Sequence, residues 1–355
     1  MRKLIDAHMH LVWWEKEGCD SIFEGLRKYQ EVNGIVAVDN MCCSSNGDLW
    51  GGFEADQSIL GAIVKLENPS VFTHGCLYLP RDHRDFEKFN FKDQLDELME
   101  LGLDGIKICD FKPDAYKLFH VGEHLEEYDE FIGYCEKNNV HMCWHVADPK
   151  SFWSFEPEYE RSKANPVYVD GSYPTYDELM DMTFAFIEAH PKLNLLLAHM
   201  FFKYSEPEEA VRVLEKYPNV CFDTAPAWGM FADYKARHSE WSKIFRQYSE
   251  RILLGTDLSF ARAPETMKVS TDPIVRFFET DDEFNTRYDI PTKGIKLEKE
   301  HLDNIFYKNH ERTVGKQPRE INKKALKKYI ERYLPFVNAT RNRQLIEEYY
   351  KKNLG

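Results

Sequence analysis

The hydrophobic positions of this chain fall into short runs, separated by longer stretches in which apolar residues recur every three or four positions. Eight runs rich in valine, isoleucine, leucine and aromatic residues occupy residues 4–10, 34–39, 71–79, 105–109, 140–146, 193–199, 220–223 and 252–257. The clearest amphipathic stretches cover residues 91–101, 125–137, 176–189 and 208–217. Buried strands that alternate with amphipathic helices are typical of parallel sheets. Eight such units predict an α/β protein with a closed (β/α)8 barrel, a TIM barrel.

An open doubly wound sheet is the competing architecture. Such sheets usually carry fewer strands, and the turn after their first strand holds a glycine-rich phosphate loop that this chain lacks. We therefore favour the barrel. In such a barrel the functional side chains gather at the carboxyl ends of the strands, so the position of a polar residue along its strand indicates its role.

Two segments depart from the strand and helix rhythm. Residues 148–175, after the fifth strand, contain four prolines and many aromatic residues, so they predict a long packed lid loop, with a disordered linker as the alternative. Residues 262–294 look like a polar loop with a short helix near 273–279. Helical patterns at 302–313, 322–333 and 342–352 follow. We expect a barrel domain over residues 1–315 and a C-terminal helical extension over 316–355, packed on the barrel.

Composition and charge limit the classes of partner that we expect. The chain has 355 residues, 43% of them hydrophobic, and a formal net charge of -14, which makes nucleic acid and anionic membrane surfaces poor partners. We expect neither a signal peptide nor a membrane span, and therefore a cytoplasmic protein. The eight cysteines form no Cys-x-x-Cys pair, and most fall in apolar runs as reduced core residues. Cys42 and Cys43 fall in an expected loop, so whether they are also reduced core residues is left open.

Polar residues at strand positions carry the candidate chemistry. His8 and His10 stand two apart on the first strand, and Asp6 is expected on the same side. Two imidazoles on a rigid element make half of a transition-metal site, and zinc takes such nitrogens readily. His145, His199 and Asp257 end the fifth, sixth and eighth runs. Any one of these histidines alone could be a satisfied core group, but several converging strand ends favour a site.

These residues together resemble the amidohydrolase superfamily of metal-dependent barrel enzymes. The closest likeness is to the branch that includes aminocarboxymuconate semialdehyde decarboxylase and related aromatic-acid decarboxylases. Residues 305–312 also look like the closing helix of that branch, although His310 stands where alanine is usual. The resemblance covers roughly residues 3 to 315 and is specific for fold and metal but weak for substrate.

The resemblance implies that His8, His10, His145 and Asp257 ligate one divalent metal ion, with zinc expected first and manganese or another ion as alternatives. His199 would touch the substrate or the reactive water. The chemistry agrees, because such an ion lowers the pKa of water and Asp257 can accept its proton as general base. Lys107 is ambiguous: it contacts substrate, it pairs with a neighbouring carboxylate, or it is carboxylated and bridges a second metal. One metal is favoured.

Substrate contacts are predicted from aromatic and cationic residues near the strand ends. The candidates are Trp13, Lys107, Phe152, Trp153 and Arg262, with Trp14, Phe155, Phe260 and Arg81 as weaker ones. Aromatic walls suit a flat or apolar ligand, and an arginine suits a carboxylate, although each residue has packing or solvation as its alternative. His74 and His141 lie within their runs, and we interpret both as structural.

Three functions compete. The first is a metal-dependent hydrolase of a small molecule, which uses metal-activated water. The second is a nonoxidative decarboxylase or hydratase, a lyase of an aromatic or unsaturated acid, which the same ligand set would serve. The third is a barrel that only binds a ligand, and the intact set of polar residues disfavours it. A homodimer is left open.

Overall fold

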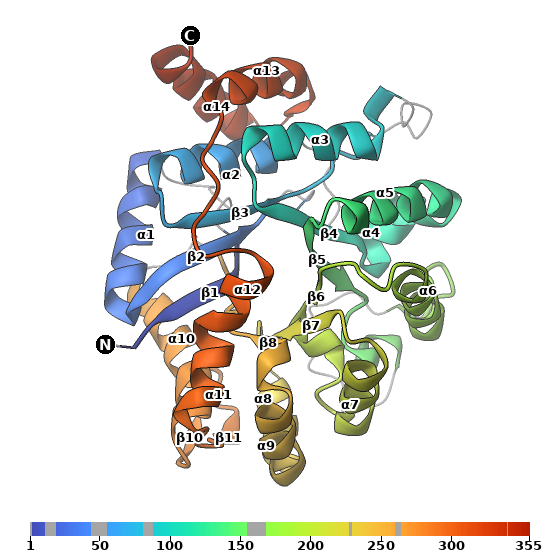
Figure 1. Ribbon diagram of the computed structural model, residues 1–355, viewed down its shortest axis with the longest axis vertical. Helices are drawn as coiled ribbons and strands as arrows, with labels where there is room; N and C mark the ends of the chain where they lie inside the picture. The colour runs from blue at the N-terminus through green and yellow to red at the C-terminus, as the bar shows by residue number, and fades with distance from the viewer. Residues whose placement is uncertain are drawn as a thin grey trace.

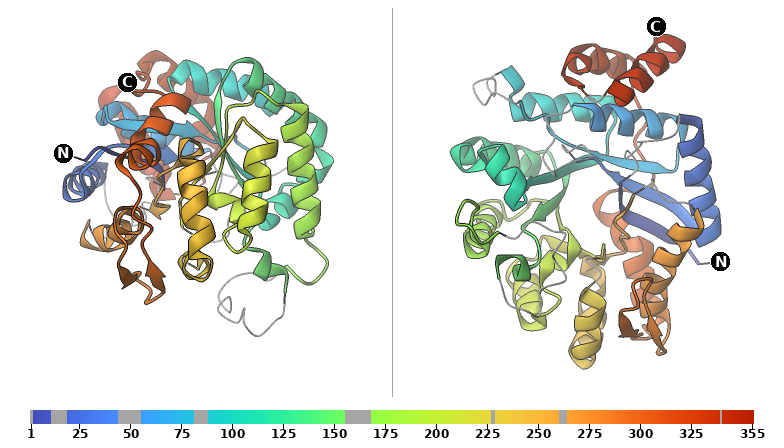
Figure 2. Two further views of the ribbon diagram at one scale, coloured as in Figure 1. Left: turned by 60° about the horizontal axis from the view of Figure 1, so that its bottom comes forward. Right: turned by 180° about the vertical axis from the view of Figure 1, so that it is seen from behind.

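The computed structural model is a barrel of parallel strands ringed by helices (Figures 1 and 2). It describes residues 2–10, 19–43, 55–80, 88–154, 168–226, 229–259, 264–338 and 340–355. The nine strands of the main sheet follow the order β8-β7-β6-β5-β4-β3-β2-β1-β9, and neighbouring strands are parallel. They are β1 (Leu4–His10), β2 (Ile35–Met41), β3 (Val71–Gly75), β4 (Gly105–Phe111), β5 (His141–Val146), β6 (Leu195–Leu197), β7 (Val220–Asp223), β8 (Ile252–Leu253) and β9 (Leu258–Ser259).

The barrel closes where the last strand segment meets the first strand. The predicted strand 252–257 is split in two: β8 pairs with β7, and β9 pairs with β1. Between them, the carbonyl of Leu254 accepts the N–H of Ala7 at 2.7 Å, and the carbonyl of His8 accepts the N–H of Asp257 at 2.8 Å. These bonds continue the seam across the break, so the predicted TIM barrel is confirmed.

The helices that follow the strands form the outer ring seen in Figure 1. They are α1 (Cys19–Asn33), α2 (Asp56–Glu67), α3 (Phe91–Leu101), α4 (Pro113–Leu118), α5 (Leu125–Lys137), α6 (Tyr176–Ala189), α7 (Pro207–Lys216), α8 (Met230–Ala236), α9 (His238–Gln247) and α10 (Pro264–Glu279). After α10 come a hairpin of β10 (Glu283–Asn285) and β11 (Pro291–Lys293), and then α11 (Lys299–Asp303), a π-helical turn (Asn304–Lys308), α12 (Asn309–Thr313), α13 (Lys323–Tyr333) and α14 (Thr340–Asn353).

Local sequence signals explain the helix ends that were predicted well. Asn90 caps α3 by accepting the N–H groups of Lys92 and Asp93, and Gly102 ends it at φ 92°, where glycine is favoured. Thr175 and Glu178 form a capping box at the start of α6. The helices predicted at 91–101, 125–137 and 176–189 match these bounds.

The region after the last strand differs from its prediction. A helix was expected only near 273–279, because proline interrupts helices. Instead α10 runs through Pro273 as one element of 16 residues. Ile274, Phe277 and Phe278 are buried in the core, and α10 packs along α1. Tertiary packing therefore outweighs the backbone hydrogen bond that Pro273 cannot make.

A buried polar network lies inside the barrel and involves residues of β2, β3 and β5. The carboxylate of Asp39 contacts His74 Nδ1 at 2.7 Å and His310 Nε2 at 3.1 Å, and His74 Nε2 lies 2.6 Å from His141 Nδ1. All four side chains are at most 3% exposed. The network joins α12 to the barrel interior, in keeping with the structural role predicted for His74 and His141.

The C-terminal helices pack on the outside of the ring. α13 contacts α2 and α3, and α14 contacts α2. Tyr333 donates a hydrogen bond to Glu97 at 2.8 Å, and Asn342 donates one to Asp56 at 2.5 Å. In the part of the chain described, none of the helices combines the length and the apolar character needed to cross a membrane.

Candidate functional site

The first strand delivers two imidazoles into the barrel through a local irregularity. The register between β1 and β2 shifts between Asp6 and Met9. Asp6 therefore contacts Tyr29 of α1 at 2.8 Å and Thr256 at 2.6 Å, whereas His8 contacts Asp223 of β7. The expectation that Asp6 shares a side with His8 and His10 was wrong, because the shift interrupts the alternation of faces. Burial raises the pKa of Asp6 to about 7.

Two further site residues adopt left-handed backbone conformations. His199 lies two residues after the end of β6 with φ 58°, and Asp257 lies between β8 and β9 with φ 53°. Residues other than glycine rarely adopt such angles, and those that do cluster at functional sites. Gly255 makes room beside them, since a Cβ at that position would lie 2.8 Å from the Cβ of His8. The strand ends are thus shaped to hold these side chains.

Hydrogen bonds fix which ring nitrogen of each histidine faces outward. His10 Nδ1 lies 2.7 Å from the carbonyl of Met41, and His199 Nδ1 lies 3.0 Å from the carbonyl of Ala225. His8 Nδ1 lies 2.8 Å from Asp223 Oδ2. Carbonyl and carboxylate oxygens only accept, so each of these nitrogens carries the hydrogen. The opposite nitrogen, Nε2, is left with its lone pair in all three rings.

His145 completes the set from the end of β5. Its Nε2 lies 3.1 Å from the carbonyl of Ala147 and 3.3 Å from Lys112 Nζ. The carbonyl of Ala147 is the nearer partner and can only accept, so we place the hydrogen of His145 on Nε2. Its Nδ1 then presents a lone pair to the site.

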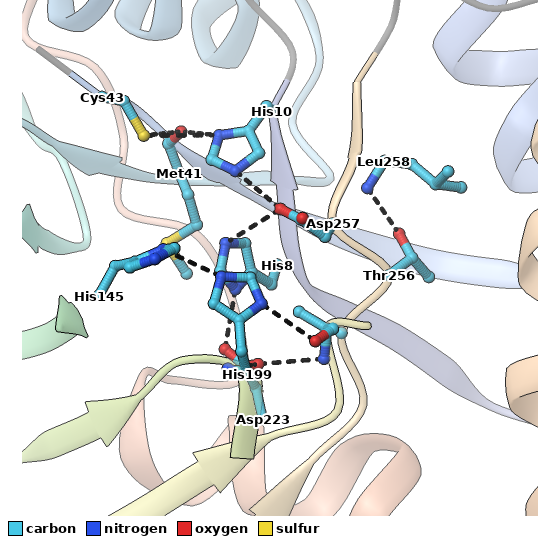
Figure 3. Close-up of polar contacts among 12 residues, drawn as sticks. His8, His10, Met41, Cys43, His145, His199, Asp223, Thr256, Asp257 and Leu258 are labelled. Atoms are coloured by element: carbon cyan, nitrogen blue, oxygen red, sulfur yellow. Dashed lines mark hydrogen bonds and ion pairs between the residues drawn. The ribbon is translucent and has the colours of Figure 1, made fainter. Parts of the chain in front are cut away.

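The four lone pairs and one carboxylate converge (Figure 3). His145 Nδ1 lies 3.0 Å from His199 Nε2, and Asp257 Oδ1 lies 3.1 Å from His10 Nε2 and 3.7 Å from His8 Nε2. Ligand atoms of His8, His199 and Asp257 all lie within 4.8 Å of one another. Facing acceptors repel unless a cation lies between them, and outward N–H groups held by oxygens are the usual support of metal-ligating histidines. The donor set therefore fits a divalent metal ion.

Burial favours the neutral forms of His8, His145 and His199. It lowers the pKa of His8 to about 4, aided by the charge of Lys107 and opposed by Asp223. Burial also lowers the pKa of His145 and of His199. Burial raises the pKa of Asp257, but its contacts with His10, His199 and His8 outweigh burial and hold that pKa below its ordinary value. Neutral imidazoles and an ionised carboxylate are the forms that bind metal.

Lys107 lies inside the barrel, as predicted, and is 1% exposed. Its Nζ lies 3.4 Å from His8 Nε2 and 3.3 Å from Cys143 Sγ. His8, Cys143 and Asp223 form a second group of close donor atoms. The ammonium group among them repels a second cation, so this group does not suit another metal.

Two supporting groups were missed in the sequence. Asp223 orients His8 and also accepts the backbone N–H of His199 at 2.8 Å. Lys112, directly after β4, donates to Asp148 and lies 3.3 Å from His145 Nε2, and Tyr168 donates to the other oxygen of Asp148 at 2.7 Å. Both Asp223 and Lys112 stand at strand ends, the same signal that identified His145 and His199.

The remaining predicted residues have contacts within the loop after β5 or lie outside the described residues. Trp153 packs against Tyr168 and Tyr176, with ring centroids 4.8 and 5.5 Å apart, and donates to the carbonyl of Pro174 at 3.0 Å. The ring centroids of Phe152 and Tyr168 lie 6.2 Å apart. These aromatic contacts agree with a packed loop over its described parts. Trp13, Trp14, Arg81, Phe155, Phe260 and Arg262 lie outside the described residues.

Comparison with known proteins identifies the class. The family model described as amidohydrolase matches residues 5–316. Among solved structures, an uncharacterised TIM-barrel protein from Bordetella bronchiseptica is 13% identical with a TM-score of 0.55, covering 88% of this chain and 98% of its own. A 2,6-dihydroxybenzoate decarboxylase from Rhizobium is 16% identical with a TM-score of 0.52, covering 88% and 99%. No curated protein matches the sequence.

With most of its length matched by that family model, the chain belongs to the amidohydrolase family and is an enzyme. The resemblance noted in the sequence is confirmed. Metal-dependent hydrolysis and decarboxylation both fit the family and this site, and a divalent metal ion fits the donor set.

Proposed function

We propose that this enzyme hydrolyses a small molecule with a divalent metal ion held by His8, His10, His145 and Asp257. One observation carries the proposal: outward N–H groups are tied to oxygens, and the inner lone pairs of the histidines face one another and a carboxylate. When bound, the ion supplies Lewis-acid chemistry, lowering the pKa of water and polarising a substrate oxygen.

The residues of the chain divide the remaining work. Asp257 Oδ1 faces the imidazoles, so Oδ2 is the atom that accepts the proton of the attacking water as general base. The Asp257 side chain is 32% exposed and so open to the mouth of the barrel. His199 keeps its hydrogen on Nδ1 against Ala225, so its Nε2 orients the reactive water or accepts a proton from the substrate.

Several finer assignments belong to the same proposal. Zinc is the first choice of metal, because nitrogen ligands dominate the set, with manganese as the alternative. Lys107 lies beside His8 and contacts substrate with its ammonium group, rather than being carboxylated and bridging two metals. Trp13, Phe152, Trp153 and Arg262 remain predicted substrate contacts. A cytoplasmic location, a homodimer and the division into 1–315 and 316–355 also remain predictions.

Nonoxidative decarboxylation is the second candidate. The Rhizobium decarboxylase shares the fold over 88% of this chain. The same donor set would serve a lyase, because an ion that polarises a scissile carbonyl also holds the oxygen of an aromatic acid.

Product analysis separates the two reactions. The purified enzyme, loaded with zinc or with manganese, is incubated with panels of esters, amides, lactones and hydroxybenzoic acids in ¹⁸O-labelled water. Incorporation of ¹⁸O into a carboxylic acid product supports the hydrolase. Release of carbon dioxide with no label in the product contradicts the hydrolase and supports the lyase. Full metal occupancy with no turnover of any member of either panel contradicts both.

A further inference from the structure

Two thiols at the mouth of the barrel contact each other beside a proposed metal ligand. Cys43 Sγ, just after β2, lies 3.2 Å from Cys109 Sγ of β4 and 3.7 Å from His10 Nδ1 (Figure 3 shows Cys43 with His10). The His10 nitrogen is the one that donates to the carbonyl of Met41, two residues before Cys43. The two thiols therefore lie next to the hydrogen bond that orients the His10 ring.

The surroundings of these thiols differ from those of ordinary core cysteines. Cys135 and Cys221 pack within clusters of buried hydrophobic residues. Cys43 and Cys109 have each other as sulfur partners, and both exist as thiols. They come from strands that are not neighbours in the sheet, β2 and β4, so a bond between them would cross over β3. This placement is typical of a bridge between elements rather than of packing.

We propose that Cys43 and Cys109 are a reversible disulfide site, formed by a peroxide that enters through the opening of the barrel. Cys43 is 3% exposed and Cys109 is 6% exposed, against 9% for His10, so a molecule of the size of hydrogen peroxide reaches them where substrate reaches His10. Their sulfur atoms must approach from 3.2 Å to a bond of about 2.0 Å, a movement of side chains rather than of strands.

The chemistry balances with hydrogen peroxide as the oxidant. The sulfur of one thiol attacks the peroxide, whose O–O bond breaks, giving a sulfenic acid and one water. The sulfur of the second thiol then displaces the hydroxyl group, forming the S–S bond and a second water. The protein loses two thiol hydrogens and two electrons, and the peroxide is reduced to two waters. A dithiol reductant reverses the change by thiol–disulfide exchange.

Peptide mapping tests the site without reference to metal or turnover, so its outcome is separate from that of the proposed function. The folded full-length protein is treated with hydrogen peroxide, remaining thiols are alkylated, and the digest is sequenced by tandem mass spectrometry. We expect one cross-linked peptide pair joining residues 43 and 109, two hydrogens lighter than the reduced peptides and lost after dithiol treatment.

Variants assign the link. Cys109→Ser should abolish it, and Cys135→Ser, which changes a thiol in the hydrophobic core, should retain it. Alkylation of both thiols after peroxide treatment of the wild-type protein would overturn the proposal, as would a link between Cys42 and Cys43 or oxidation of each sulfur to a sulfinic acid with no link. The wild-type result stands even if a variant fails to fold.

Discussion

His145 Nδ1 and His199 Nε2 lie 3.0 Å apart, and the hydrogen bonds of both rings leave each of these nitrogens with a lone pair rather than a hydrogen. Two lone pairs this close repel each other, and a cation bound between them removes that repulsion. The same holds for His10 Nε2 and Asp257 Oδ1 at 3.1 Å. The site is organised for a cation before one arrives, and this organisation is the basis of the predictions that follow.

His145→Ala should remove most of the bound metal. Removing an imidazole leaves fewer ligands, and affinity should fall by more than the roughly 10–100-fold typical of changes in residues that only support ligands. Metal content after dialysis is measured by plasma emission. His190→Ala is the matched control, because His190 binds Asp129 on the surface. Equal metal in both variants would contradict the assignment of His145.

Asp257→Asn should lower activity while leaving the fold intact. Asparagine tolerates the left-handed φ of 53° at this position, so the backbone is retained. The amide cannot accept the proton of water as a base, and kcat should fall by roughly 10²–10⁴-fold. Rates and thermal unfolding are measured together. A loss of rate smaller than tenfold, with normal metal content, would show that another group is the base.

Asp223→Asn should weaken metal binding although Asp223 lies behind the ligand. An amide group facing His8 Nδ1 favours moving the imidazole hydrogen to Nε2, the nitrogen that faces the site. We expect metal affinity to fall by about 10–100-fold, measured by competition with a chromophoric chelator. The exposed Asp281→Asn variant, whose side chain pairs with Lys296, should bind metal like the wild type.

Asp39→Asn should destabilise the barrel in a pH-dependent way. Burial raises the pKa of Asp39, but the charges and hydrogen bonds of His74 and His310 outweigh it and hold the pKa well below 3.8. The unfolded chain then binds this proton more readily, so the stabilisation is present above pH 3.8 and is lost as the pH falls below it.

Urea unfolding of both proteins at pH 7 and near pH 3.5 measures the effect of Asp39→Asn. At pH 7 the variant should lose about 3–5 kcal/mol, since a buried charged partner is removed. The difference between the two proteins should shrink at the lower pH. The same difference at both pH values would exclude the ionised carboxylate as its source.

Tyr168→Phe should loosen the loop after β5 without changing metal content. The lost hydroxyl donates to Asp148 at 2.7 Å, and a hydrogen bond of this kind contributes about 0.5–1.5 kcal/mol. Local opening should therefore become roughly two- to tenfold more frequent. Hydrogen exchange of peptides from residues 148–154 and 168–175 measures it. Unchanged exchange there would mean that the Trp153 contacts hold the loop without this bond.

Much of the site was predictable because barrel strands end at one face. His8, His10, His145, His199 and Asp257 all stand at strand ends in the sequence, and the structure brings them together. The fold followed from eight apolar runs separated by amphipathic stretches. Their roles as ligand, base or substrate contact remain predictions, because position on a strand does not reveal which atom binds what.

Other features depend on interactions that no local pattern encodes. The shift after Asp6 arises from pairing with β2, so a strict alternation of faces misplaced this residue. The predicted sixth strand 193–199 is shorter, Leu195–Leu197, because the backbone turns left-handed at His199. Helix α10 continues through Pro273 because buried side chains around it pack on the core.

The contacts between the first and last strands link closure of the barrel to formation of the candidate site. The backbone N–H of Asp257 donates to the carbonyl of His8, and this bond forms only when the first and last strand segments of the barrel have docked. A nascent or partly folded molecule in which that junction is still open presents scattered imidazoles with no carboxylate among them. Under the proposed ligand assignment, the complete donor set therefore exists only in the closed barrel.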